Sequence, residues 1–281
     1  MKARNKMRQL INQKGKVIRA VGAHNGLTAR LVERHNFDAV WASGFEISSS
    51  FAKPDANILS MTEFKNITEN IIESTTLPVI ADCDTGFGNV NNVIETVKKF
   101  ENIGVSGISI EDKIFPKMNS FVEKGQSLIS KKEFEDKLKA AKDTQIDPDL
   151  IIIARIESLI AGSGMDDALE RAFAYYQAGA DMILIHSKIH NPSEVLQFRK
   201  LWNYPTPVVI VPTTYPMFSV EEARNNDFKM LIYANPIIRS SVKAINDTLS
   251  KLYSSDSLLE IDDDLIDMSY MFDLQKVKEM V

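Results

Sequence analysis

The sequence has a single cysteine, Cys83, among its 281 residues. One cysteine forms neither an intramolecular disulfide nor a metal site made of cysteines alone, and it is typical of a reducing compartment. No apolar run approaches the ~18 residues of a membrane-spanning helix. The basic start "MKARNKMRQLINQKGK" also lacks the apolar core of a signal peptide. We therefore expect a cytoplasmic protein without a membrane partner, although an organellar presequence removed upstream stays an open alternative.

Blocks of positive charge are missing too. The formal net charge is -5 and the pI is near 5.5, which argues against nucleic acid as the partner. There is no internal repeat and no low-complexity tract. With 44% hydrophobic and 25% charged residues the composition is that of an ordinary globular protein. One or two domains are possible, because α/β barrels commonly reach ~250 residues as one unit.

Short apolar runs recur along the chain, with helix-length segments between them. They cover residues 16–22, 37–44, 77–84, 105–112, 150–157, 181–187, 206–213 and 229–235. Runs of this length, bounded by Gly, Pro or Asp and alternating with helical patterns, predict βα units in a parallel sheet. Val93, Val97 and Phe100, for example, share one face of a helix that we expect to end at Gly104.

Eight such units predict a (β/α)8 TIM-type barrel over residues 1–253. A doubly wound open sheet is the alternative, but no G-x-G-x-x-G follows the first run. Residues 254–281 are acidic and then amphipathic, and they predict a C-terminal helical extension that packs on the barrel or on a partner subunit. Its apolar stripe, for which plain packing is the simpler explanation, consists of Leu265, Met268, Met271 and Phe272.

Carboxylates gather at the ends of two neighbouring runs, where barrel enzymes have their active sites. Asp82 and Asp84 are two residues apart, so strand alternation puts them on the same side, and Glu111 ends the next run. Three hard oxygen donors predict a site for Mg²⁺, with Mn²⁺ as the second possibility, and some of them bind Mg²⁺ only through water. Two helix-capping aspartates are the simpler alternative.

Positive groups end the fifth and sixth runs, at Arg155 and His186. A guanidinium grips a carboxylate or phosphate with two hydrogen bonds, and a nearby imidazole adds another donor. The alternative is an Arg155–Glu157 ion pair beside a structural histidine. Together with the carboxylates, the pair predicts the chemistry of a metal-bound anionic substrate.

Five motifs occur in order along the chain: "AHNGLTARL", "WASGFEIS", "DCDTGFGN", "EDKIFPKMNS" and "LIHSK". They resemble the phosphoenolpyruvate mutase branch of the isocitrate lyase superfamily, and the similarity runs from about residue 16 to 253. The lyases of that superfamily carry a "KKCGH"-type loop with a catalytic cysteine, which this chain lacks. The resemblance implies an Mg²⁺-dependent isomerase that interconverts phosphoenolpyruvate and phosphonopyruvate, the step that forms the P–C bond in phosphonate biosynthesis.

The resemblance also implies roles for individual residues. Asp82, Asp84 and Glu111 correspond to the metal cluster, with Asp82 touching the ion most directly. Substrate binding is implied for Trp41, Ser43, Gly44, Phe45 and Ser120, of which the Ser43 and Gly44 amides hold the carboxylate and the enolate oxygen. Catalytic roles are implied for Asp55, Lys117, Asn119, Arg155 and His186. Of these, Lys117 and Asn119 belong with Ser120 to a mobile lid, which meets Asp55 when it closes.

Two positions depart from the family pattern. Gly22 stands before "AHNG" where a glutamate is expected, so the support of His24 and Asn25 is expected to be looser. Met118 fills a variable slot in the lid.

Three other functions stay open. Phosphonopyruvate hydrolase uses the same scaffold, but there a threonine tends to occupy the slot of Asn119, so asparagine favours the mutase. A lyase for a methylisocitrate-like or oxaloacetate-like acid is disfavoured by a lysine-rich lid without cysteine. A non-catalytic, anion-binding barrel is expected to have lost acids or cations, and none is missing. Since family members exchange C-terminal helices, the resemblance also implies a homodimer or homotetramer with swapped helices.

Overall fold

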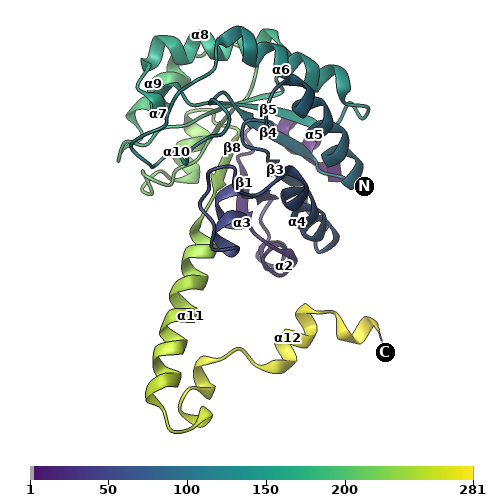
Figure 1. Cartoon of the computed structure of the whole chain (residues 1–281), viewed down its shortest axis with the longest axis vertical. Coiled ribbons are helices and arrows are strands. Elements are labelled where there is room, and N and C mark those ends of the chain that lie inside the picture. Colours follow the sequence, from purple (N-terminus) through teal and green to yellow (C-terminus); the bar gives the residue numbers. More distant parts are fainter. Residues whose placement is uncertain (1–2, 281) are drawn as a thin grey trace. The chain divides into compact units, whose positions relative to one another are not determined.

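The computed structural model describes residues 3–280, and its eight parallel strands close into a barrel (Figure 1). They are β1 (Ile18–Ala23), β2 (Ala39–Ala42), β3 (Val79–Asp82), β4 (Gly107–Glu111), β5 (Ile151–Ile156), β6 (Met182–Ile185), β7 (Val208–Ile210) and β8 (Met230–Tyr233). Each strand pairs with the next in sequence, and β8 pairs with β1. The predicted (β/α)8 barrel is confirmed, and each predicted run coincides with one strand, although β1 extends one residue beyond its run.

Helices surround this sheet (Figure 1). They are α1 (Ala3–Asn12), α2 (Gly26–Arg34), α3 (Gly44–Ser50), α4 (Met61–Glu73), α5 (Val90–Ile103), α6 (Lys131–Thr144), α7 (Ser158–Ala161), α8 (Gly164–Gln177), α9 (Ser193–Leu201) and α10 (Val220–Asn225). In α5 the predicted apolar face of Val93, Val97 and Phe100 is buried. The helix ends at Gly104, whose φ of 96° is a left-handed conformation that glycine adopts without a Cβ penalty.

The interior of the barrel is filled with side chains. Ile18 and Ala20 of β1 share one apolar cluster with Ile151 and Ile153 of β5, alternate residues of each strand. Met7 of α1 joins the same cluster. Each buried Ile or Met side chain contributes roughly 1.5–3 kcal/mol relative to an exposed one. Because the interior is packed, polar chemistry is confined to the rim of the barrel.

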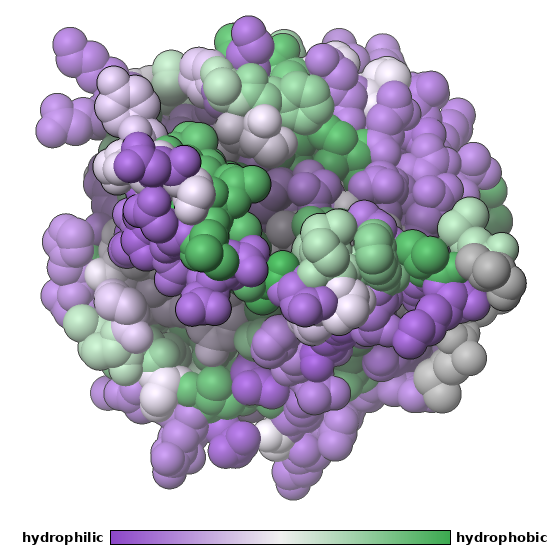
Figure 2. Space-filling view, turned by 90° about the horizontal axis from the view of Figure 1, so that it is seen from below, coloured by the Kyte–Doolittle hydropathy of each residue, from purple (hydrophilic) through white to green (hydrophobic). Residues whose placement is uncertain are grey.

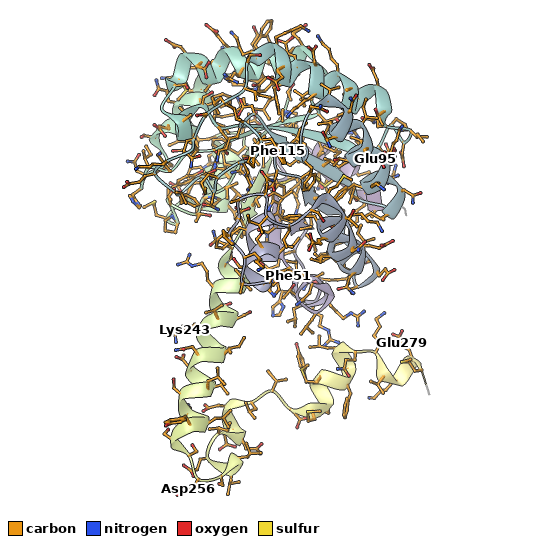
Figure 3. The ribbon with its side chains drawn as sticks, viewed as in Figure 1. Phe51, Glu95, Phe115, Lys243, Asp256 and Glu279 are labelled. Carbon is orange, nitrogen blue, oxygen red and sulfur yellow. The ribbon has the colours of Figure 1, made fainter. Side chains whose placement is uncertain are left out.

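The chain divides after Asn235 into two compact units. The second contains α11 (Pro236–Ser254), α12 (Met268–Leu274) and three 3-10 turns, η1 (Leu258–Glu260), η2 (Asp262–Asp264) and η3 (Val277–Glu279). Helix α11 thus belongs to the C-terminal unit. The boundary predicted from the sequence lay after residue 253, whereas the two units divide after Asn235. On α11, Lys243 pairs with Asp247 at 2.6 Å (Figure 3). Three members of the apolar stripe, Leu265, Met268 and Phe272, are exposed.

No helix within residues 3–280 combines the length and the apolar character needed to cross a membrane. The face in Figure 2 is mainly hydrophilic, with separate hydrophobic patches. Scattered apolar side chains of this kind are normal on a protein surface.

Candidate active site

A cavity of about 80 Å³ lies at the carboxyl ends of the strands. Its lining consists of Trp41, Ser43, Phe45, Asp55, Asp82, Lys117, Asn119, Ser120, Phe121, Arg155, His186, Val211, Thr213, Ala234 and Asn235. Of the residues assigned to the site from sequence, all line the cavity except Gly44, Asp84 and Glu111. These three lie behind the lining and contact it. Residues that are far apart in sequence therefore meet at the predicted rim.

The three predicted metal-site carboxylates lie near one another, with Asp82 in the cavity lining and Asp84 and Glu111 beside it. All three are buried, and a Cβ on Gly44 would lie 3.2 Å from Asp82 Oδ2 and 3.3 Å from Asp84 Oδ1. Strand alternation is not what brings the two aspartates together, because β3 ends at Asp82 and the chain turns at Asp84 with φ 50°. Arg155 Nε approaches Glu111 Oε2 to 3.2 Å. A side chain on Gly44 would therefore crowd both aspartates, which would have to shift by a few tenths of an ångström.

The oxygen donors of the carboxylate cluster are of the chemical kind that binds a divalent cation. Burial raises the pKa of Asp82 and of Asp84, and the neighbouring carboxylates add to the effect. Both carboxylate oxygens of Glu111 are buried and accept no hydrogen bond from residues 3–280. In that same range no group of three or more acidic, histidine or cysteine side chains, the predicted trio included, is placed to hold a metal ion by itself. Hard oxygen donors with free acceptor capacity fit Mg²⁺, which retains several waters and needs few direct protein ligands.

The loop between β4 and α6 covers the cavity. We call residues 113–129 the lid; Phe115, labelled in Figure 3, belongs to it. Lys117 Nζ lies 2.8 Å from Asp55 Oδ1 and 2.8 Å from Asp84 Oδ1. Asn119 Nδ2 donates a hydrogen bond of 2.7 Å to Asp55 Oδ2. The contact expected between Asp55 and a closed lid is therefore present.

Lys117 is charged in this closed state. Its side chain is only 4% exposed. Burial alone would lower the pKa of Lys117, but Asp84 and Asp55 raise it well above its ordinary value. Lys117 in turn holds the pKa of Asp55 below its usual range, although burial opposes this. The lid is thus fastened by a buried ammonium between two carboxylates.

Arg155 and His186 lie side by side, with 3.0 Å between Arg155 Nη2 and His186 Nδ1. Glu157 Oε1 accepts a 2.5 Å hydrogen bond from Arg155 Nε and lies 2.8 Å from His186 Nδ1. The ion pair considered as the plain alternative does exist, and both basic residues nevertheless line the cavity. Burial, together with Arg155, lowers the pKa of His186, while Glu157 opposes the shift.

The segment of Ser43 and Gly44 begins α3. Ser43 Oγ accepts from Glu46 N at 3.3 Å and donates to Ala234 O at 2.9 Å, which fixes the start of the helix on β8. The amide of Ser43 donates to Ala23 O at 3.3 Å, and that of Gly44 donates to Asp82 Oδ2 at 3.4 Å. Both bonds are long, so a stronger acceptor in the cavity could replace them at a cost of ~1 kcal/mol or less each.

Asn57 belongs to the site although it was not among the residues predicted from the sequence. Its Nδ2 donates to Asp84 Oδ2 at 2.7 Å, and its Oδ1 accepts from Lys117 N at 2.6 Å. Asn57 has φ 55°, a left-handed conformation that asparagine tolerates better than most residues. It connects the metal-site carboxylates to the lid backbone. The only signal in the sequence was its nearness to Asp55, since no spacing rule marks such a residue.

The expected loss of support near His24 is not found. A Cβ on Gly22 would lie 2.7 Å from Ala234 O and 2.8 Å from Glu46 Oε1, so a larger residue does not fit. Glu46 is fully buried, and its Oε2 lies 3.1 Å from His24 Nδ1. His24 therefore has an acidic partner that comes from α3.

Comparison with known proteins finds similarity along most of the chain. The family described as phosphoenolpyruvate phosphomutase matches residues 7–253. Phosphoenolpyruvate phosphomutase from Tetrahymena pyriformis is 42% identical over 92% of this chain and 86% of its own length. The crystal structure of phosphoenolpyruvate phosphomutase from Streptomyces platensis subsp. rosaceus has a TM-score of 0.97 at 44% identity and covers 99% of this chain and 96% of its own. A phosphonopyruvate hydrolase in complex with oxalate and Mg²⁺ has a TM-score of 0.95 at 39% identity, over 100% and 97% of the two chains.

Proposed function

The chain belongs to the phosphoenolpyruvate phosphomutase family, and from this premise we propose that it interconverts phosphoenolpyruvate and phosphonopyruvate. Overall similarity does not separate this isomerase from the hydrolase, because the two structures are 44% and 39% identical to the chain. The observation that favours the mutase over the hydrolase is the position of Asn119. It lines the cavity, and its Nδ2 donates to Asp55 Oδ2 at 2.7 Å. By the family resemblance, a hydrolase tends to have threonine there.

The reaction moves a phosphoryl group between two atoms of one substrate. The bond from phosphorus to the C2 oxygen of phosphoenolpyruvate breaks, and a bond from phosphorus to C3 forms. Breaking the first bond leaves pyruvate enolate and a metaphosphate-like group in a loose transition state. We assign Arg155, His186 and Asn119 to hold the phosphoryl oxygens while C3 turns toward phosphorus. Fixed donors of this kind stabilise charge without reorganising during the reaction.

The pyruvate part of the substrate is assigned to the opposite wall of the cavity. Trp41 and Phe45 are suited to pack against its flat carbon skeleton. The amides of Ser43 and Gly44 are the candidate donors to its carboxylate and enolate oxygen, since their present hydrogen bonds are 3.3 and 3.4 Å long. We assign Ser120, on the lid, to substrate binding through Arg155, from which its hydroxyl accepts at 3.2 Å while donating to Glu157 Oε2 at 2.7 Å.

We assign Asp82, Asp84 and Glu111 to hold Mg²⁺, with Mn²⁺ as the alternative. When bound, such an ion would stabilise the negative charge that develops on the enolate oxygen. Asn57 orients Asp84 through the 2.7 Å hydrogen bond to its Oδ2.

Exclusion of water is the task of the lid. Water inside the cavity would capture the phosphoryl group, so the reaction has to proceed behind a closed lid. Lys117 fastens the lid to Asp55 and Asp84, and Asn119 adds its own hydrogen bond to Asp55. These contacts require lid residues and barrel residues at once, so they form only on closure.

For the assembly, we propose a homodimer or homotetramer with exchanged C-terminal helices. On α11 the apolar residues Val242, Ile245 and Leu249 follow a three-four spacing and are 58–60% exposed. A stripe of this kind is typical of a helix that packs on another subunit. Light scattering after gel filtration tests this proposal, and a monomer at micromolar concentration would contradict it. The cytoplasmic assignment rests on the single Cys83.

Phosphorus NMR of the purified protein with phosphonopyruvate and Mg²⁺ tests the function. Growth of a phosphoenolpyruvate signal that EDTA abolishes is the expected result. Direct release of phosphate would make the protein a hydrolase. Unchanged phosphonopyruvate would favour a lyase or a non-catalytic barrel.

A further inference from the structure

A buried carboxylate to which the mechanism above gives no role lies between the lid and the basic pair. Glu157 directly follows β5 and is fully buried. Its backbone N–H donates to Asp112 Oδ1 at 2.9 Å, which fixes it from behind. Burial would raise the pKa of Glu157, but Arg155, His186 and Lys113 lower it well below its ordinary value. Glu157 therefore carries a full negative charge inside the protein.

The two oxygens of Glu157 serve different parts of the site. Oε1 accepts from Arg155 Nε at 2.5 Å and lies 2.8 Å from His186 Nδ1. Oε2 accepts from Ser120 Oγ of the lid at 2.7 Å and lies 3.1 Å from Lys113 Nζ. One side of the carboxylate thus holds the residues assigned to the phosphoryl group, and the other side meets the lid.

Glu157 also holds one ring nitrogen of His186 in place. His186 Nδ1 lies near both Glu157 Oε1 and Arg155 Nη2, at 2.8 and 3.0 Å. A carboxylate only accepts and a guanidinium only donates, so Nδ1 meets an acceptor and a donor at once, and a hydrogen on Nδ1 would be directed to Glu157. The edge-on ring of Phe121, 5.7 Å away, adds a lid contact to the same imidazole.

The two ends of the lid are fixed to each other, and the part between them contacts Glu157. Lys113 pairs with Leu128 in a β-bridge, so the two ends of the lid are joined and its tip is the part free to move. Lys113 Nζ donates to Met118 O at 3.0 Å and to Ser120 Oγ at 2.6 Å. Lys113 and Glu157 thus form a buried pair that receives Ser120 when the tip comes down.

Resting on the proposed function, we propose that Glu157 is a positioning residue that couples closure of the lid to the orientation of Arg155 and His186. With the lid closed, Ser120 and Lys113 hold Oε2, so Oε1 is fixed where it aims the basic pair into the cavity. With the lid open, Oε2 loses Ser120 and the carboxylate gains freedom to turn. The basic pair is then aligned for phosphoryl transfer only when water is shut out.

The first test is the kinetics of Glu157→Gln, which keeps the size of the side chain and removes its charge. Misalignment of catalytic groups lowers kcat by about 100-fold. KM should stay the same or fall, because removing a negative charge near the phosphoryl site does not weaken the attraction of an anion. A purely structural defect would instead lower the folded fraction and leave the kcat and KM of the folded enzyme unchanged.

The second test measures lid closure without turnover. Trypsin cleaves after Lys117 only when the lid opens, because that side chain is 4% exposed, while exposed Lys124 in the same loop is the internal control. Oxalate with Mg²⁺ is the probe, since its planar dianion has the shape of pyruvate enolate. In the wild type we expect the probe to block cleavage at Lys117 but not at Lys124. In Glu157→Gln the probe should still bind, and cleavage should occur at both.

The matched control is Glu101→Gln. Glu101 is also a buried carboxylate, but it caps the segment before β5, accepting from Ile146 N at 3.0 Å and from Asp147 N at 2.7 Å. That segment lies at the amino ends of the strands, opposite the cavity. We expect Glu101→Gln to lower Tm at most, with kcat and the protection of Lys117 as in the wild type.

The outcomes separate this inference from the proposed function. A Glu157→Gln enzyme with kcat within about threefold of the wild type, or with full protection of Lys117, would overturn the inference. If that variant does not fold, Ser120→Ala removes the hydroxyl that joins the lid to Glu157, Arg155 and Lys113, leaves Glu157 charged, and should give the same loss of protection; retained protection would again overturn the inference. If the wild type fails to interconvert the two substrates, the proposed function is wrong, and the protease result still decides whether Glu157 responds to the lid.

Discussion

Lys117 fastens the closed lid, and Lys117→Met removes its charge at nearly constant size. In the wild type its ammonium lies 2.8 Å from an oxygen of Asp55 and 2.8 Å from one of Asp84. In the variant, a closed lid would bury both carboxylates without this cation. Opening the lid hydrates them, so the equilibrium should shift to the open state.

The size of the effect follows from the burial of the pair. Removing one partner of a buried ion pair costs about 3–5 kcal/mol. Each 1.4 kcal/mol is about tenfold in an equilibrium, so the closed-to-open ratio should fall by about 100- to 4,000-fold. If transfer occurs only behind the closed lid, kcat falls with the closed population, by up to the same factor. The barrel core is untouched, and Tm should therefore change little.

Rates of phosphoenolpyruvate formation by phosphorus NMR, with Tm measured in parallel, check this prediction. Lys124→Met is the control, because it removes an exposed lysine from the same loop and should leave kcat unchanged. A folded Lys117→Met enzyme with kcat within about tenfold of the wild type would refute the role of Lys117 in holding the lid.

Three further predictions address the product, the metal and pH. Asn119→Thr should increase the share of free phosphate among the products seen by phosphorus NMR; an unchanged share would mean that Asn119 does not select the mutase reaction. Asp82→Ala should raise the Mg²⁺ concentration needed for half-maximal activity and lower the maximal rate, and an unchanged Mg²⁺ titration would exclude it as a ligand. The buried Lys137 donates from Nζ to Thr85 O at 3.1 Å, and burial lowers the pKa of Lys137 below its ordinary value of 10.5. Between the lowered pKa and 10.5 the unfolded chain binds more protons, so this group makes stability rise with pH in that window. Urea unfolding at several pH values should show a weaker rise in Lys137→Met, and parallel curves for the two proteins would contradict the assignment.

The strands could be predicted from local sequence because each is an apolar run bounded on at least one side by Gly, Pro or Asp. A closed parallel barrel then brings all strand ends to one rim, which is why Asp82, Glu111, Arg155 and His186 could be assigned to one site. Asp55 and Asn119 are different, since they lie in loops and no periodicity places them. Their assignment depended on the family resemblance alone.

Contacts between loops were outside the reach of sequence patterns. Asp84 was expected beside Asp82 by strand alternation, yet a φ of 50° after the end of β3 is what turns it there. Asn57 was missed because its two partners, Asp84 and Lys117, are 27 and 60 residues away. Glu157 was considered only as a partner of Arg155, and its contact with Ser120 spans 37 residues.

The sequence by itself determined the barrel, the rim and the kinds of charge that meet there, because hydrophobic periodicity and strand order are local properties. Tertiary structure decided which oxygen of Glu157 faces the lid, which nitrogen of His186 meets Glu157, and that Lys117 lies between two acids. The physical reason is that hydrogen bonds and ion pairs require atoms within about 3 Å in a defined direction. Only the folded chain fixes such distances between side chains on separate loops.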